Sequence, residues 1–289
     1  MKILAFDIGG TEIKYGIIDD GLIVIKGAFP SNAKLGGKMI LASVTDKAIE
    51  LSKNDVFEGL AISSAGVIDT TTGVVIESTD AIPDFVGLNI KDTLESSTGL
   101  LTYVENDVNC VAIAESSFYP NASSLFFVTI GTGIGGAIVI NQKLYHGHSY
   151  SAGEIGKFLF GQKTFESIAS TAAIVQLALS KGLNIKNGKD LFELAENNHP
   201  LATSIVGQFY DTFSMGMASV IYLLNPQVIV IGGGLSARES VIDNIKLKLF
   251  EKLPSYYIQN VQIYSAKYKN DAGIMGAYLN FITKKNANA

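Results

Sequence analysis

The amino-acid sequence predicts an α/β protein built from two related domains. Short apolar runs alternate along the chain with longer segments whose apolar residues recur at helical spacing. The opening strand–turn–strand pattern returns near the middle of the chain, where residues 125–140 resemble residues 2–18. At about 150 residues per domain, the 289 residues correspond to about two domains. We therefore expect one domain over residues 1–119 and a second over residues 120–289.

The first half of the chain opens with three short strands, at residues 2–6, 15–18 and 22–27, which predict a meander. A helix is predicted over residues 38–53, where the apolar positions fall on one face: Ile40, Leu41, Val44, Ala48 and Leu51. The other elements predicted for this half are strands at 59–63 and 100–104, a hairpin at 67–76, and helices at 90–97 and 108–117.

The second half repeats the opening unit and then becomes richer in helices. Two strands, at 125–130 and 137–140, flank a turn of glycine and threonine residues. The remaining predicted elements are strands at 228–231 and 261–264 and helices at 170–181, 189–197, 201–224 and 272–282.

The composition is that of a globular protein with a large core. Hydrophobic residues make up 47% of the chain and charged residues 17%, which excludes a disordered chain. The 22 basic and 27 acidic side chains give a net charge of −5, and no basic cluster suggests a nucleic-acid partner. The single cysteine, Cys110, excludes an internal disulfide and a cysteine-based zinc cluster. We therefore expect a cytoplasmic protein.

The sequence gives no sign of a membrane partner or of a secretory signal. The apolar run at the start of the chain, residues 3–6, has only four residues before Asp7. The uncharged stretch 123–140 is interrupted by glycines and threonines, and the apolar stretch 217–224 ends at Asn225 and Pro226. Neither provides about 20 continuous apolar residues, so we expect both to be buried strands or helices.

The segment from Asp7 to Thr11 follows the first strand and is a candidate phosphate-binding turn. Gly9 and Gly10 allow a tight turn with its N–H groups toward an anion, and Thr11 adds a hydroxyl donor. An aspartate at the end of a strand is suited to holding Mg²⁺ through water. An ordinary hairpin turn explains this segment equally well.

A second glycine-rich turn contains Gly131, Thr132 and Gly133 and repeats this arrangement. An apolar strand follows it instead of a helix, which disfavours a dinucleotide-binding fold. Two matching turns in the two halves suggest a single polyphosphate bound from both sides of a cleft. A third cluster, which includes Gly233 and Gly234, could let a base or a sugar approach the backbone.

Polar residues collect at 105–109, between a predicted strand and a predicted helix. This position places their side chains near the mouth of a cleft. Capping of the helix by Asn106 or Asp107 explains the same residues equally well. Small residues at 272–277 suit close packing of the last helix against either a ligand or a strand.

The order and spacing of these segments resemble the ROK family of sugar kinases, within the actin-like ATPase superfamily. The motifs that carry the resemblance are DIGGT at 7–11, ENDVN at 105–109, IGTGIGGA at 130–137, AGEIG at 152–156, NPQVIVIGGG at 225–234 and AGIMGA at 272–277. The resemblance implies two actin-like (ribonuclease H-like) domains, each with a mixed sheet flanked by helices, and an active site in the interdomain cleft. It also implies that the last helix packs back on the first domain and that the protein is a homodimer.

The resemblance further implies roles for individual residues. Asp107 corresponds to the catalytic base, and Gly66, Asn106, Glu154 and Glu166 correspond to sugar-binding residues. ATP and Mg²⁺ are the implied cofactors, with Asp7 holding the metal through water. The residues implied to bind ATP or its phosphates are Asp7, Gly9, Gly10, Thr11, Gly131, Thr132, Gly133, Gly233 and Gly234.

The sequence departs from the family pattern next to the AGEIG motif. Lys157 stands where the family commonly has a histidine, and residues 158–164 contain no cysteine. We therefore expect no structural zinc. His146 and His148 are two residues apart and are interpreted as part of a solvated turn rather than as a metal site. Glu12 also stands where many members have lysine.

We expect an ATP-dependent kinase that phosphorylates a hexose hydroxyl, at C6. Glucose, fructose, N-acetylmannosamine and a β-glucoside are all open as substrates, and the missing histidine and zinc loop suggest a roomier sugar site. The alternative is a sugar-binding regulatory protein without kinase activity. Repressors of the family carry a helix-turn-helix before the sugar-binding core, and this sequence begins at the first phosphate motif, so we expect the enzyme.

Overall fold

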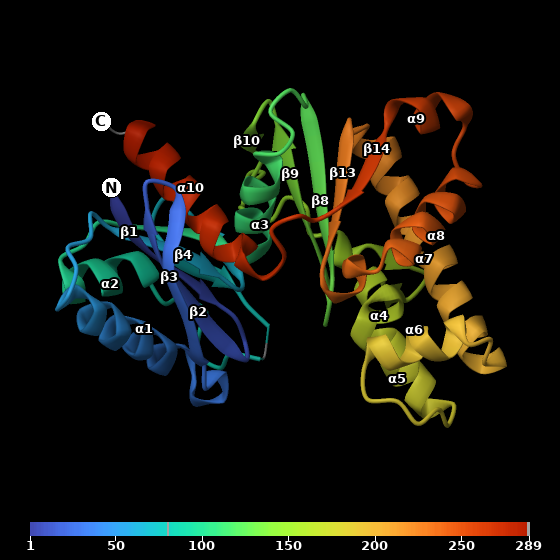
Figure 1. The fold of residues 1–289 in the computed structure, drawn as a ribbon, viewed down its shortest axis with the longest axis horizontal. Helices are drawn as coiled ribbons and strands as arrows, with labels where there is room; N and C mark the ends of the chain where they lie inside the picture. Colours follow the sequence, from blue (N-terminus) through green and yellow to red (C-terminus); the bar gives the residue numbers. More distant parts are fainter. Residues whose placement is uncertain (80, 288–289) are drawn as a thin grey trace. The chain divides into compact units, whose positions relative to one another are not determined.

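The computed structural model describes residues 1–79 and 81–287 and divides into two compact units (Figure 1). The first unit comprises residues 1–118, 146–151 and 270–289, and the second comprises residues 119–145 and 152–269. The segment 146–151 therefore belongs to the first unit, although both of its neighbours along the chain belong to the second.

The first unit is built on a five-stranded mixed sheet of order β3-β2-β1-β4-β7. The strands β1 (Lys2–Ile8), β2 (Glu12–Asp19) and β3 (Leu22–Pro30) are antiparallel, which confirms the predicted meander. The strands β4 (Leu60–Ser64) and β7 (Thr102–Asn106) add to β1 in parallel. Four successive residues of β1, from Ile3 to Phe6, have no exposed surface, as expected for a central strand covered on both faces.

Helices cover both faces of this sheet, as Figure 1 shows. The helices α1 (Gly37–Ser52) and α2 (Ile90–Thr98) contribute Ile40, Val44 and Leu94 to one apolar core with Phe6. The helices α3 (Asp107–Ser116) and α10 (Ala272–Ala287) pack against each other, and α10 also contacts β1, β4 and β7. The predicted hairpin is present as β5 (Val67–Asp69) and β6 (Val74–Glu77).

The contact between α3 and α10 depends on a glycine. The Cα of Gly276 lies against the backbone of Cys110, and a Cβ at residue 276 would collide with the carbonyl group of that cysteine. Gly276 therefore serves close packing against a neighbouring helix, whereas the sequence suggested a ligand or a strand as the partner of these small residues.

The second unit contains a matching five-stranded sheet of order β10-β9-β8-β13-β14. The strands β8 (Ser124–Ile130) and β9 (Ile134–Ile140) are antiparallel, as β1 and β2 are. The strands β13 (Val228–Gly232) and β14 (Gln262–Ser265) continue the sheet in parallel, and β10 (Lys143–Leu144) forms its edge. The prediction of an α/β fold with mixed sheets flanked by helices is confirmed.

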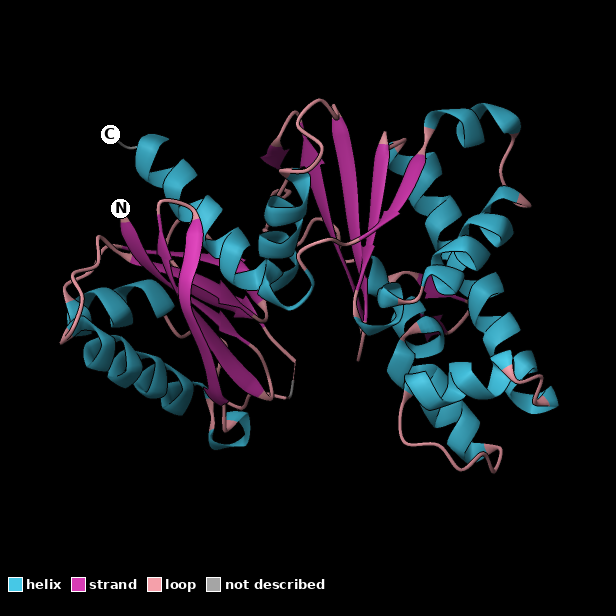
Figure 2. Ribbon diagram, in the orientation of Figure 1, coloured by secondary structure: helices cyan, strands magenta, loops and turns pink. Residues whose placement is uncertain are grey.

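The helices of the second unit pack beside its sheet (Figure 2). They form a core with Phe126 of β8 and Ile229 of β13, in which the rings of Phe165 and Phe209 both contact Phe213. These helices are α4 (Phe165–Ala169), α5 (Thr171–Ser180), α6 (Gly188–Glu196), α7 (Pro200–Leu224), α8 (Glu239–Phe250) and α9 (Ser255–Asn260). Single-turn 3₁₀ helices lie at Ala33–Leu35, Ile155–Lys157, Gly234–Ala237 and Lys269–Asp271.

The structure differs from the sequence prediction in a few elements. The strand β9 begins at Ile134 rather than at residue 137, because Gly135 and Gly136 pair with β8. The helix α10 continues to Ala287, beyond the predicted end at residue 282. The edge strand β10, the short hairpin of β11 (Leu159–Phe160) and β12 (Lys163–Thr164), and the helices α4 and α9 were not predicted, and α8 was expected only as a helix of unstated bounds after the third glycine cluster. Among the described residues, no helix combines the length and the apolar character needed to cross a membrane.

Candidate functional site

Asp7 lies near the end of β1, where its carboxylate is almost enclosed by protein. Its neighbour in the register of β4 is Ser63, whose hydroxyl donates a hydrogen bond to Asp7 Oδ1 over 2.7 Å. On another side lies Gly273 in the first turn of α10, where a Cβ would sit 2.6 Å from each carboxylate oxygen. Burial raises the pKa of Asp7. The nearby helix N-terminus is favourable for a negative charge at this position.

The turn between β1 and β2 keeps its candidate phosphate ligands open to solvent. Gly10 and Thr11 are exposed, and the Gly9 N–H donates to the carbonyl of Glu12 over 3.1 Å. Gly9 and Gly10 both have backbone angles outside the positive-φ region, so the chain does not use their conformational freedom here. The turn is thus an ordinary connection between antiparallel strands whose exposed groups are available to a ligand.

Three of the predicted sugar-site residues lie together where β7 meets α3. The Asn106 side-chain amide donates to the carbonyl of Gly66 over 2.9 Å and to Asp107 Oδ1 over 3.0 Å. Asn106 Oδ1 accepts from the N–H of Asn109, so Asn106 caps α3. The predicted capping role is confirmed, and the same side chain also binds Gly66 and Asp107.

Gly66 and Asp107 are held in place by the backbone around them. Gly66 has a φ of +96°, and a Cβ there would lie 2.7 Å from the carbonyl oxygen of Glu77. The position therefore requires glycine. Asp107 Oδ1 also accepts from the N–H of Val108 over 2.8 Å. The carboxylate is thus fixed at the first turn of α3 and is only partly buried.

His146 does not lie in a solvated turn, which corrects the sequence prediction. Its side chain is only 25% exposed, and Nε2 lies 2.8 Å from Oε2 of Glu105, a carboxylate with no exposed surface. Glu105 Oε1 accepts from the N–H of Asn106 and from the side chain of Asn109. Sequence reasoning had given neither His146 nor Glu105 a role, although Glu105 stands inside the ENDVN motif. His148 is exposed, as predicted.

In the second unit, Glu166 lies against the glycine-rich turn at 131–133. A Cβ at Gly133 would sit 2.7 Å from Glu166 Oε2, and one at Gly156 would sit 3.2 Å from the same oxygen. Lys157 Nζ approaches Glu166 Oε1 to 3.3 Å. Glu166 thus forms an ion pair with Lys157 and lies beside the turn. Glu154 is exposed and precedes the 3₁₀ turn Ile155–Lys157.

The two glycine-rich turns of the second unit also lie together. Gly233 has a φ of +92°, and a Cβ there would collide with the backbone of Ile130. The Gly131 N–H donates to the carbonyl of Gly133 over 3.0 Å, and the N–H of Ala172 in α5 approaches the carbonyl of Gly131 to 3.4 Å. These contacts bring the end of β8 close to the end of β13 and to the start of α5.

A cavity of about 730 Å³ opens at this point. One end is formed by the turn residues Gly131 and Thr132. Beyond it, the walls are the start of α5, residues 187–189 at the start of α6, and residues 234–238 after β13. Apolar side chains such as Ile130, Val175 and Leu235 contribute to the lining. The cavity is large enough for a drug-sized ligand and combines an apolar interior with a turn that can bind an anion.

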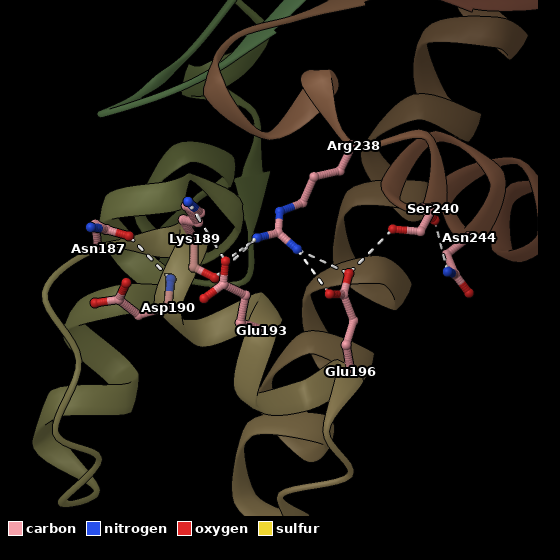
Figure 3. Close-up of polar contacts among 8 residues, drawn as sticks. All are labelled: Asn187, Lys189, Asp190, Glu193, Glu196, Arg238, Ser240 and Asn244. Atoms are coloured by element: carbon pink, nitrogen blue, oxygen red, sulfur yellow. Dashed lines mark hydrogen bonds and ion pairs between the residues drawn. The ribbon is translucent and has the colours of Figure 1, made fainter.

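Charged residues tie two walls of this cavity together, as Figure 3 shows. Arg238 Nη1 donates to both carboxylate oxygens of Glu196, each over 3.0 Å, and Nη2 donates to Glu193 over 3.2 Å. Glu193 and Glu196 belong to α6, whereas Arg238 precedes α8. Within the described residues, no group of three or more histidine, cysteine, aspartate or glutamate side chains could hold a metal ion.

Comparison with known proteins identifies a family and relatives whose sequences are similar to that of this chain. The model of the ROK family matches residues 3–284. An uncharacterized protein from Clostridium perfringens is 38% identical over 98% of this chain and 97% of its own length. A β-glucoside kinase from Listeria innocua is 32% identical over 99% of both chains.

Solved structures share the fold over nearly the whole length. A ROK family protein from Streptococcus pneumoniae, solved in complex with sucrose, superposes with a TM-score of 0.88 at 27% identity, over 99% of this chain and 100% of that chain. A ROK family glucokinase from Streptomyces griseus, solved in complex with glucose and AMPPNP, superposes with a TM-score of 0.78 at 26% identity. The latter match covers 96% of this chain and 98% of that chain.

Proposed function

This chain belongs to the ROK family of sugar kinases, and we propose that it transfers the γ-phosphoryl group of ATP to the C6 hydroxyl of a hexose carried in a β-glucoside. The observation that carries the proposal is the position of Asp107. Its carboxylate is fixed at the start of α3 beside Asn106, which in turn is bonded to Gly66. Proteins similar to this chain include a β-glucoside kinase and a ROK family protein solved with sucrose.

Asp107 acts as the general base. The Asp107 carboxylate is partly open to solvent and accepts hydrogen bonds from two donors, which orient it to accept a proton from a sugar hydroxyl. The hydroxyl oxygen then attacks the γ-phosphorus. The bond between this phosphorus and the oxygen that bridges it to the β-phosphate breaks, and ADP leaves with that oxygen and the electron pair of the bond. Phosphoryl transfer depends on positioning and charge stabilisation, so the fixed orientation of Asp107 is its main contribution.

Asp7 is suited to holding Mg²⁺ through water. Ser63 binds Oδ1, and Oδ2 is the oxygen that would accept from a water of the ion's shell. A single carboxylate fits an ion that retains most of its waters. When bound, Mg²⁺ would neutralise charge on the phosphates. The hydrogen bond from Ser63 fixes the Asp7 carboxylate, which would orient this shell.

The cavity of the second unit takes the nucleotide. The apolar side chains Ile130, Val175 and Leu235 suit a planar base, and the N–H group and hydroxyl of Thr132 suit phosphates. A ROK family glucokinase with similar structure has been solved with an ATP analogue, AMPPNP. In the first unit, the exposed Gly10 and Thr11 are further candidate phosphate ligands.

Glu154 and Glu166 bind sugar hydroxyls. A carboxylate accepts two hydroxyl donors at once, and Glu166 is held beside the phosphate-binding turn by its contacts with Gly133 and Gly156. Lys157 in place of the histidine and the lack of a zinc loop at 158–164 suggest a roomier sugar site, which favours the larger β-glucoside over a free hexose.

The test is an ADP-release assay over a panel of sugars. The panel contains glucose, fructose, N-acetylmannosamine and a β-linked glucoside such as cellobiose, each with Mg²⁺ and with EDTA. We expect Mg²⁺-dependent ADP release that is fastest with the β-glucoside, and a product phosphorylated at C6 by NMR. ADP release that no sugar stimulates would reject the kinase function, and faster turnover of a free hexose would reject the β-glucoside.

A further inference from the structure

Arg238 is the single arginine among the 289 residues of the chain, beside 21 lysines. It stands at the end of the turn that follows β13 and lines the cavity of the second unit. Its side chain is 22% exposed, and its charged end points away from the turn toward α6 (Figure 3). Since lysine supplies positive charge everywhere else in the chain, this position uses a property that lysine lacks.

That property is the planar, forked guanidinium group. Nη1 binds both oxygens of Glu196, and Nη2 binds Glu193 Oε1 over 3.2 Å and the carbonyl of Lys189 over 3.4 Å. Three groups spaced along α6 are therefore held by one side chain. A lysine ammonium is a point charge and cannot bind a carboxylate in this two-pronged way. Isolated surface ion pairs contribute little, but a bidentate pair within a network is the exception.

These contacts fix the spacing between two walls of the cavity. One wall consists of residues 187–189 at the start of α6. The other consists of residues 234, 235, 237 and 238, and Arg238 contacts the first wall at the carbonyl of Lys189. Ser240 Oγ, which follows Arg238, approaches Glu196 Oε1 to 3.4 Å and adds a second tie to the same carboxylate. Ser240 belongs to α8, so within this cluster it is Arg238 that ties α6 to the end of the turn 234–237.

We infer that Arg238 is a positioning residue for the nucleotide: it sets the width of the slot between α6 and the turn 234–237 in which the base binds. This inference rests on the proposed function of the cavity. Glu193 and Glu196 both pair with Arg238, and Glu193 Oε1 also lies 3.8 Å from Nζ of Lys189, so the two cations that line this end of the cavity are already paired with carboxylates. The nucleotide therefore binds with its phosphates at Gly131 and Thr132 and its base beside α6.

The experiment measures ADP binding by calorimetry without sugar, so it does not depend on kinase activity. The variants are Arg238→Ala, Arg238→Lys and, as a matched control, Lys248→Ala. Lys248 is also a cation near two acidic groups, Glu251 at 3.1 Å and Asp211 at 3.7 Å, but it lies on α8 away from the cavity. We expect Arg238→Ala to weaken ADP binding about 10-fold, within the range for contacting residues. Arg238→Lys should lose nearly as much, and Lys248→Ala should bind ADP normally.

Two further measurements separate positioning from a general loss of structure. In the kinase assay, Arg238→Ala should raise the KM for ATP while the KM for the sugar stays unchanged. In a double-mutant cycle, adding Glu196→Gln to Arg238→Ala should weaken ADP binding much less than Glu196→Gln does alone. Normal ADP binding by Arg238→Ala, or an equal loss in Lys248→Ala, would overturn the inference and leave the kinase function standing. Failure of the unaltered protein to bind ADP would overturn both.

Discussion

His146 Nε2 lies 2.8 Å from Oε2 of Glu105, and Glu105 is completely buried. The other oxygen of this carboxylate accepts from the N–H of Asn106 and from the Asn109 side chain. One buried group therefore connects the segment 146–151 to the point where β7 ends and α3 begins. The ammonium group of Lys284 in α10 also attracts Glu105 electrostatically.

The first prediction is that His146 stabilises the protein through Glu105. His146→Ala removes a donor to a buried carboxylate and should lower the free energy of unfolding by about 1.5–3 kcal/mol. His146→Gln can still donate and should recover part of the loss. The measurement is urea denaturation, with the exposed His148→Ala as control. Equal stability of the two alanine variants would show that the contact with Glu105 contributes nothing.

The second prediction concerns Asp107 as the base. Asp107→Asn should lower kcat by at least about 100-fold, the contribution typical of a positioned base, with sugar binding nearly unchanged. Asp92→Asn is a matched control, because Asp92 also lies in the first turn of a helix and accepts from a capping asparagine, Asn89. Steady-state kinetics and sugar calorimetry check both variants. Near-normal turnover by Asp107→Asn would show that Asp107 is not the base and serves only the local contacts at the start of α3.

The third prediction separates sugar binding from ion pairing at Glu166. Glu166→Gln should raise the sugar KM by about 10- to 150-fold, the value for a lost hydrogen bond to a charged acceptor, and leave the KM for ATP unchanged. Lys157 is 56% exposed, so Lys157→Ala should change the sugar KM by less than about 5-fold, as for a surface ion pair. If the two variants have equal effects, Glu166 acts only through the lysine. Glu154→Gln should resemble Glu166→Gln.

The fourth prediction is a pH dependence that comes from Lys284. Burial lowers the pKa of this lysine, whose ammonium donates to the carbonyl of Thr70 over 3.1 Å. Between that lowered pKa and the ordinary lysine value, the unfolded chain binds more protons than the folded protein, so stability from this group rises with pH. The unfolding free energy of the unaltered protein should therefore rise relative to that of Lys284→Met as the pH increases from 7 to 10. Lys285→Met, on the same helix, is the control. A constant difference would contradict the prediction.

Elements with a strong local pattern could be predicted from the sequence. Central strands such as β1 and β13 are continuous apolar runs, and α1 has apolar residues at regular helical spacing. The helices α4 and α9 have only five and six residues, which is less than two turns and too short for a period to be recognised. The glycines at the start of β9 resemble a turn, but pairing with β8 makes them part of a strand.

The contacts that organise the candidate site could not be predicted in the same way. Glu105 and His146 are 41 residues apart, and no local pattern connects them. Glu166 and Gly133 likewise meet only after α4 has packed. The residue types at Asn106 and Asp107 could be identified from the motif, but whether they cap the helix or bind a ligand could not. The structure shows that capping holds both side chains in place.

The packing of α10 has a consequence for the order in which the protein is completed during synthesis. This last helix covers α3 and part of the first sheet, and it begins at residue 272. After residue 118 has been made, 272 − 118 = 154 further residues must be added before the helix can start to form. At about 5–20 residues per second, the nascent first unit waits roughly 10–30 s with an apolar surface uncovered. The first unit is therefore synthesised first but completed last. A chaperone would encounter it while the apolar surface that α10 later covers is still exposed.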